Sequence, residues 1–368
     1  MKKRSTTLVI ATGVAVFLFC SNVKAGDPTR SGQSGASELL INPWAASSGF
    51  ANANSSCVQG VEAQFLNVAG TAFTNKTEVI LGSTNYLGGS GINISAAGFC
   101  QHVGESGVLG LSIMSMNFGS IQITNFDNPD GGVGSYNPEY ININLSYARG
   151  FSDNIYGGLD VKLISEAISN VTAFGIAVNA GIQYVAGDKK QIHFGIALNN
   201  VGPQMKYSGD GLAFETPLPN SSVTGSSASM TVEQRSQGYE LPSLVNMGAA
   251  YDFHIMKDSS GRSFHRITVA ANFTSNSFEQ DEEMLGVEYG FKSFLSVRIG
   301  YDYMNGITGS LSTNPTTGGR LTAFTGPCAG ITLQVPFGKN HSIFGVSYAY
   351  RATNPFTACQ TVGVKMTL

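Results

Sequence analysis

The sequence predicts an all-β protein: a 14-stranded antiparallel transmembrane β-barrel with an N-terminal hatch or plug segment. Three observations support this prediction. Apolar and polar residues alternate from Thr77 to the C-terminus, long and short connections alternate along the chain, and charged residues make up only 12% of the 368 residues. A soluble domain would carry about a quarter charged residues, so the shortage favours contact with lipid.

The alternation is clearest in the stretch 283–303. Leu285 and Val287 share one face of a first predicted strand, and Ile299 lies on the same face of a second strand. The opposite face carries small and charged residues, including Glu288 and Arg298. One apolar face with aromatic ends and one polar face are typical of a barrel strand that has lipid outside and a polar lumen inside.

The same two-residue period identifies the other strands. The fourteen predicted strands are 77–86, 92–103, 108–118, 139–149, 155–165, 174–185, 191–200, 243–253, 265–273, 283–291, 294–303, 329–337, 342–350 and 361–368.

The connections differ in length according to their place in this order. The segments after even strands are mostly short, such as 104–107 and Lys292-Ser293, and those after odd strands are mostly long, such as 119–138 and 201–242. Short periplasmic turns and long extracellular loops are typical of outer-membrane barrels, and a soluble sandwich gives no reason for such a division. The expected location is therefore the cell outer membrane.

The segments before the barrel have different characters. Residues 1–25 have a basic start followed by an apolar run, which indicates a secretory signal peptide. Residues 26–76 do not alternate, and we expect them to fold back into the barrel as a hatch. The barrel itself is expected to span 77–368.

Charged residues on the polar faces of the strands are expected to project into the lumen, because an unpaired charge facing hydrocarbon costs a few kcal/mol. They could form a structural network of ion pairs or could serve transport, and the first interpretation is favoured. The residues are Asp160, Lys162, Glu288, Arg298, Asp302 and Lys365.

No catalytic or cofactor-binding pattern is present. The five histidines have no neighbouring nucleophile, and the glycine-rich pieces lie between strands, so we predict neither an enzyme nor a cofactor or metal. The net charge of −3 gives no basic patch for nucleic acid.

Four cysteines follow the signal peptide, and an oxidising compartment permits disulfides. We consider a pair between Cys328 and Cys359 and another between Cys57 and Cys100, with buried free thiols as the alternative.

Several short motifs resemble the PorV/PorQ family of Bacteroidetes outer-membrane proteins, which is itself similar to FadL-type channels. The motifs, which occur in the family's order, lie at 35–43, 64–70, 197–207, 239–242, 286–289 and 298–301, although Val68 stands where the family has proline. The resemblance implies a FadL-like barrel that acts in the type IX secretion system.

Two functional hypotheses follow. In the first, a non-enzymatic PorV-like protein binds the translocon, or the C-terminal signal domains of secreted cargo, through its long loops, which also meet lipid and lipopolysaccharide. In the alternative, a FadL-like transporter passes small hydrophobic molecules through an apolar lumen pocket gated near residues 39–44. The candidate partner-binding residues of the first hypothesis are Ile121, Phe126, Tyr136, Met205, Tyr207 and Phe214.

Overall fold

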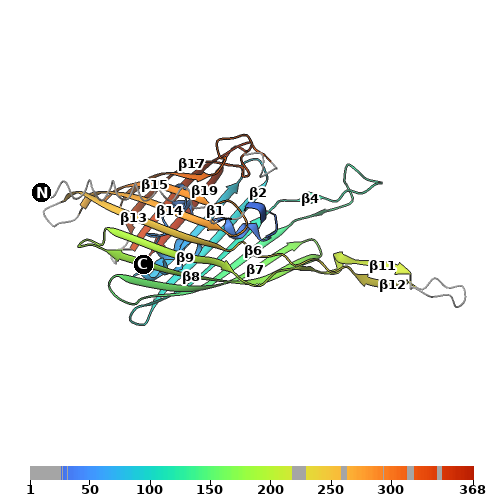
Figure 1. Ribbon diagram of the computed structural model, residues 1–368, viewed down its shortest axis with the longest axis horizontal. Coiled ribbons are helices and arrows are strands. Elements are labelled where there is room, and N and C mark those ends of the chain that lie inside the picture. Colours follow the sequence, from blue (N-terminus) through green and yellow to red (C-terminus); the bar gives the residue numbers. More distant parts are fainter. Residues whose placement is uncertain are drawn as a thin grey trace, which may run out of the picture.

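A computed structural model describes residues 26, 28–30, 32–217, 229–257, 263–292, 294–312, 319–337 and 342–368. The predicted signal peptide, 1–25, and Ser293 of the predicted turn lie outside the described residues. In the described part the chain forms one large tilted sheet, and two long hairpins extend from it at one end (Figure 1).

The main sheet is a closed antiparallel barrel of fourteen strands, as predicted. Its order follows the sequence, with β1 paired to β19 to close the barrel, β8 paired to β9 across a short turn and β9 paired to β13 across the long loop, while the short β10 adds to the edge of β8. The barrel strands are β1 (Thr77–Tyr86), β2 (Ile92–Val103), β3 (Gly107–Asn117), β6 (Glu139–Gly150), β7 (Ile155–Ile168), β8 (Val171–Ala186), β9 (Ile192–Val201), β13 (Leu244–Lys257), β14 (Ser263–Asn276), β15 (Glu282–Phe291), β16 (Leu295–Met304), β17 (Phe324–Phe337), β18 (Ser342–Thr353) and β19 (Cys359–Thr367).

The two faces of the wall differ as the alternation predicted. Leu285, Val287 and Ile299 are exposed on the outside, whereas Glu288 and Asp302 are buried inside. An apolar outer band and a polar interior define an outer-membrane barrel, so the protein lies in that membrane.

The long loops contain short strands that the alternation did not reveal. One loop holds the hairpin of β4 (Ile121–Gln122) and β5 (Ser135–Tyr136); the other holds β10 (Tyr207–Ser208), the 3-10 turn η5 (Asp210–Leu212), and the hairpin of β11 (Ala213–Pro217) and β12 (Ser229–Glu233). Both hairpins extend well beyond the barrel (Figure 1). The connection between β7 and β8 is an exception to the length rule, because only residues 169–170 join these strands at the long-loop end.

The described residues of the N-terminal segment 26–76 form short helical turns with little extended chain. They are η1 (Pro28–Arg30), η2 (Ser37–Leu40), α2 (Ala45–Gly49), η3 (Gly60–Glu62), α3 (Ala63–Leu66) and η4 (Val68–Phe73). None of the described helices has the length and apolar character needed to cross a membrane.

This segment presses against the inner face of the wall where inward positions are glycine. A Cβ atom at Gly300 would lie 2.8 Å from the carbonyl carbon of Phe50, one at Gly195 would lie 2.7 Å from Cα of Ser56, and one at Gly158 would lie 2.9 Å from the carbonyl oxygen of Val68. Because these three glycines belong to different parts of the barrel, the segment crosses the lumen and touches several sides of it. Glycine is needed at such positions for close approach of two backbones.

Candidate functional site: the barrel lumen

A small cavity of about 50 Å³ lies in the lumen between the N-terminal segment and strands β9, β13, β14 and β15. Leu39, Phe65, Leu244 and Met284 supply apolar surface, and a group of amides supplies polar surface. The amides that line it belong to Asn42, Asn52, Asn199, Asn200 and Asn246.

The size of the cavity limits what it can hold. A void needs roughly 10–15 Å³ of this kind of volume to hold one water molecule, and an engineered cavity of about 150 Å³ holds benzene. The lumen cavity therefore accommodates a few waters in this conformation, and a hydrocarbon would require residues 39–42 or the neighbouring side chains to move.

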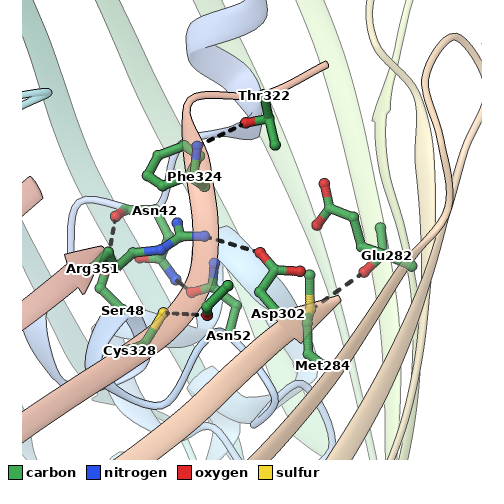
Figure 2. Close-up of polar contacts among 12 residues, drawn as sticks. Asn42, Ser48, Asn52, Glu282, Met284, Asp302, Thr322, Phe324, Cys328 and Arg351 are labelled. Atoms are coloured by element: carbon green, nitrogen blue, oxygen red, sulfur yellow. Dashed lines mark hydrogen bonds and ion pairs between the residues drawn. The ribbon is translucent and has the colours of Figure 1, made fainter. Parts of the chain in front are cut away.

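A charged pair lies beside this cavity at the long-loop end of the lumen. The guanidinium of Arg351 donates a 3.0 Å hydrogen bond to Asp302 and lies 4.2 Å from the centre of the Phe324 ring (Figure 2). Asn42 and Asn52 join their side chains by a 3.0 Å hydrogen bond near this pair. The pair gives this end of the lumen a fixed polar surface, because both partners are held in place.

The long loop and the N-terminal segment are joined at the same end of the lumen. The amide of Gly35 donates to the carbonyl of Glu240 at 3.0 Å, and buried Met205 packs with Ala36 and Leu39. We call residues 34–40, 205–207 and 239–241 the clasp. It connects the segment in the lumen to the loop that carries β11 and β12.

Two buried carboxylates lie at the clasp, Glu38 within it and Glu166 on the adjoining strand β7. Glu166 of β7 accepts hydrogen bonds from the hydroxyls of Tyr207 and Tyr239, the second at 2.8 Å. Glu38 is buried, and neither of its carboxylate oxygens has a hydrogen-bond partner among the described residues. Burial, and secondarily the charge of Glu166, raise the pKa of Glu38 to about 8, so this carboxyl is largely protonated at neutral pH.

The predicted lumen charges all face inward, but they form separate groups and not one network. Glu288 pairs with Arg298 at 2.6 Å and with Arg266, and Asp302 pairs with Arg351. The ammonium of Lys365 lies 3.0 Å from the carboxylate of Glu78.

Asp160 and Lys162 are bound to amides. The side chain of Asn179 donates to Asp160 at 2.7 Å, and Lys162 donates to Asn200 at 2.9 Å. Each of these two charges thus has a local hydrogen-bond partner.

Arg266, Arg351 and Glu78 complete these pairs and were absent from the sequence-based set. Glu78 and Arg351 lie at the ends of strands, where the alternation is weakest. The register of the barrel brings Arg266 and Glu78 to their partners, because β14 lies beside β15 and β1 beside β19, whereas Arg351 of β18 reaches Asp302 of β16 across β17. Alternation along each strand does not give the register between strands, and this register is needed to predict which charged residues pair.

One prediction concerns the Lys365 pair. Replacing Lys365 by methionine leaves the buried carboxylate of Glu78 without its counter-charge, and removal of one partner of a buried pair costs about 3–5 kcal/mol. The backbone amide of Val61 still donates to Glu78, which places the expected loss at the lower end of that range. Urea-induced unfolding in detergent measures it. Replacing the exposed Lys76 by methionine serves as the control and should leave stability nearly unchanged.

The structure divides the candidate partner-binding residues into two sets. Ile121, Phe126 and Phe214 are exposed on the projecting hairpins, and Tyr136 is half-buried on β5. Met205 is buried in the clasp, and Tyr207 packs against it. The expectation that these two side chains are presented on the loop surface is therefore wrong for this conformation. Their apolar character reflects packing on the lumen wall.

All four cysteines of the described chain are free thiols, so neither disulfide considered from the sequence is formed. Cys328 and Cys359 both lie opposite Arg351, one on each side of β18. Two strand spacings separate them by about 9–10 Å, beyond the reach of a disulfide. Cys57 and Cys100 belong to different apolar clusters inside the barrel. Among the described residues, no group of histidine, cysteine and carboxylate side chains has metal-binding geometry.

The architecture therefore defines a class: outer-membrane β-barrels of fourteen antiparallel strands. No protein-family model matches the sequence, and no curated protein matches it. Solved structures do match, although at low sequence identity.

Three of these structures have a TM-score of 0.50. The CymD monoaromatic hydrocarbon channel is 11% identical, with 89% of this chain and 97% of that chain covered. A FadL homologue of Pseudomonas aeruginosa is 12% identical, with 88% and 97% covered. The Pseudomonas putida toluene transporter TodX is 11% identical, with 85% and 93% covered. At these identities the likeness establishes a FadL-like fold.

Proposed function

We propose that this protein is a passage for small hydrophobic molecules across the outer membrane, held closed in the conformation described. The observation that carries the proposal is the cavity beside residues 39–42, where apolar side chains such as Leu39, Phe65 and Met284 form part of the wall and asparagine amides form the rest. Two of the similar solved structures are described as a monoaromatic hydrocarbon channel and a toluene transporter, which supports the same proposal.

Opening requires no change in the barrel wall. The cavity is bounded on one side by the N-terminal segment, which is attached to the wall mainly by side-chain contacts and by hydrogen bonds from wall side chains such as Asn199 and Asn246 to its carbonyls. Displacement of residues 39–42 would enlarge the cavity towards the volume that an aromatic hydrocarbon needs. The N-terminal segment is thus proposed to be the hatch that the sequence suggested.

Uptake into proteoliposomes tests this function, with toluene and a long-chain fatty acid as the two probes. We expect Met284→Ala to increase toluene uptake, because it enlarges the cavity, and Leu244→Trp to reduce uptake, because it fills the cavity. Met247→Ala is the matched control, since Met247 lies on the outer face of β13. The proposal would be contradicted if neither toluene nor the fatty acid entered the proteoliposomes faster than it enters empty liposomes.

A second candidate function rests on the projecting hairpins. Phe126 is fully exposed, and Ile123, Val133, Phe214 and Met230 are also exposed apolar side chains of the two loops. Such side chains at the tips of loops are suited to contact with a protein partner. The resemblance to the PorV/PorQ family makes the type IX translocon or its cargo the candidate partner.

Co-purification from the native outer membrane tests this second function. We expect Phe126→Ser to reduce recovery of a secretion component by about tenfold, the loss typical of one large apolar anchor. Asp130→Asn in the same loop is the control. Equal recovery with both variants, or recovery of no secretion component at all, would count against loop docking. Neither result depends on toluene uptake.

A further inference from the structure

The outer wall of the barrel has a groove on its lipid-facing side. It has a volume of about 700 Å³ and crosses β6, β7, β8 and β9 near their short turns. Its lining is almost wholly apolar, apart from Arg149 at one end. We propose that this groove binds a glycerophospholipid of the periplasmic leaflet, with the acyl chains in the groove and the phosphate at Arg149.

The register of the strands explains why a groove forms on an otherwise convex wall. Outward positions on neighbouring strands make rows, and one row contains Arg149, Gly157, Ile182 and Ile196. The next row runs through Tyr147, Leu159, Ala180 and Leu198. Ala180 is a low position among tall side chains, so the wall is recessed there, while the ring of Phe151 covers Gly157 at the turn end.

Aromatic and aliphatic side chains form the sides of the recess. Tyr184 and Phe194 stand opposite each other on β8 and β9, and Phe151 lies over Gly157 at the turn end. These rings are exposed, which is the position of the aromatic girdle of a barrel at the membrane interface. The groove therefore begins at the headgroup level and runs towards the membrane centre.

Arg149 supplies the polar contact at the headgroup level. Its guanidinium carbon lies 5.4 Å from the centre of the Phe151 ring, which holds the exposed side chain at the end of the groove. Within the described chain no carboxylate forms an ion pair with Arg149, although Asp153 and Asp188 lie in the adjacent turns. Guanidinium groups bind phosphate by paired hydrogen bonds.

The position of the groove selects the kind of lipid. Short turns mark the periplasmic end of an outer-membrane barrel, so Arg149 and Phe151 lie at the periplasmic leaflet. A diacyl glycerophospholipid has one phosphate for Arg149 and apolar chains for the recess. This charge complementarity, together with the shape of the recess, distinguishes a bound lipid from the mobile lipid that surrounds any barrel.

The experiment compares retained lipid in full-length protein purified from its native outer membrane in mild detergent. Native mass spectrometry counts the bound phospholipids on wild-type protein, Arg149→Gln and Ala180→Phe. Lys292→Gln is the control for charge, since Lys292 also lies beside aromatic rings at a short turn. Ala329→Phe is the control for shape, because Ala329 faces outward opposite Ile299. Equal chromatographic elution and heat-modified mobility show that all variants are folded.

We expect one phospholipid on the wild-type protein and on both controls. Occupancy should fall by about tenfold or more in Arg149→Gln, the loss expected for a charge-assisted hydrogen bond, and by a similar factor in Ala180→Phe. Absence of retained phospholipid on the wild type would overturn the proposal, as would equal retention by all five proteins. Recovery of lipopolysaccharide, or of a second copy of the chain in place of phospholipid, would also overturn it.

Discussion

Replacing Trp44 by alanine is expected to release the N-terminal segment from the barrel wall without unfolding the barrel. Trp44 is fully buried, packs edge-on against Phe65 with ring centres 5.8 Å apart, and lies over Gly82 of β1. Removing a buried tryptophan side chain costs about 3–5 kcal/mol. Because the fourteen strands keep all their ladder hydrogen bonds, this cost falls on the attachment of the segment.

Hydrogen exchange measures that effect locally. The amide of Ser48 donates to the carbonyl of Trp44 at 3.0 Å, and its exchange should accelerate by about 10²–10⁴-fold. Amides of β15 and β16 should exchange at unchanged rates. Trp44→Phe is the matched variant: the indole nitrogen of Trp44 has no hydrogen-bond partner among the described residues, so phenylalanine should preserve most of the attachment. Faster amide exchange throughout the barrel would contradict this prediction, because it would show that the N-terminal segment and the barrel wall open together.

The second large effect is that the attachment of the N-terminal segment depends on pH, and this dependence originates at Glu38. The pKa of this carboxyl rises to about 8, mainly because of burial and to a smaller extent because of the negative charge of Glu166. The positive charge of Lys162 lowers the pKa and offsets part of this rise. A group whose pKa is raised in the folded state stabilises that state fully at low pH. Its contribution is lost as the pH rises from the unfolded pKa, 4.5, through 8.

We therefore expect the attachment of residues 34–41 to weaken between pH 5 and pH 9, by about 5 kcal/mol at most. The Glu38→Gln variant keeps the neutral shape and should remove most of this dependence. Exchange of the Leu39 and Ile41 amides, corrected for the intrinsic effect of pH, measures it. Glu105→Gln, in an exposed turn, is the control. A wild-type profile as flat as that of Glu38→Gln would show that Glu38 is not the titrating group.

The barrel wall follows from short-range patterns, which is why the sequence predicted it well. In a strand the side chains alternate between faces, so a wall with lipid on one side and polar groups on the other imposes a period of two residues. The predicted bounds of 77–86 and 92–103 agree with β1 and β2, and the fourteen predicted strands correspond to the fourteen barrel strands. The inward direction of Asp160, Glu288 and Asp302 follows from the same period.

The loops were less predictable because the fold of a loop depends on what it meets. Met205 and Tyr207 have the apolar character of partner-binding residues, but the structure packs them against Ala36 and β8. Nothing within the loop sequence distinguishes these residues from Phe126, which is fully exposed. The difference arises from contacts with distant parts of the chain.

The sequence by itself determined the barrel, the number of its strands, the faces of the wall and the end of the short turns. Only the tertiary structure decided which charges pair, that Cys328 and Cys359 are separated by a strand, and how residues 26–76 lie against inward glycines such as Gly300. It also revealed the recess at Ala180. The physical reason is that alternation is a property of each strand alone, whereas pairing, recesses and buried carboxylates depend on register and on segments that meet only after the barrel closes.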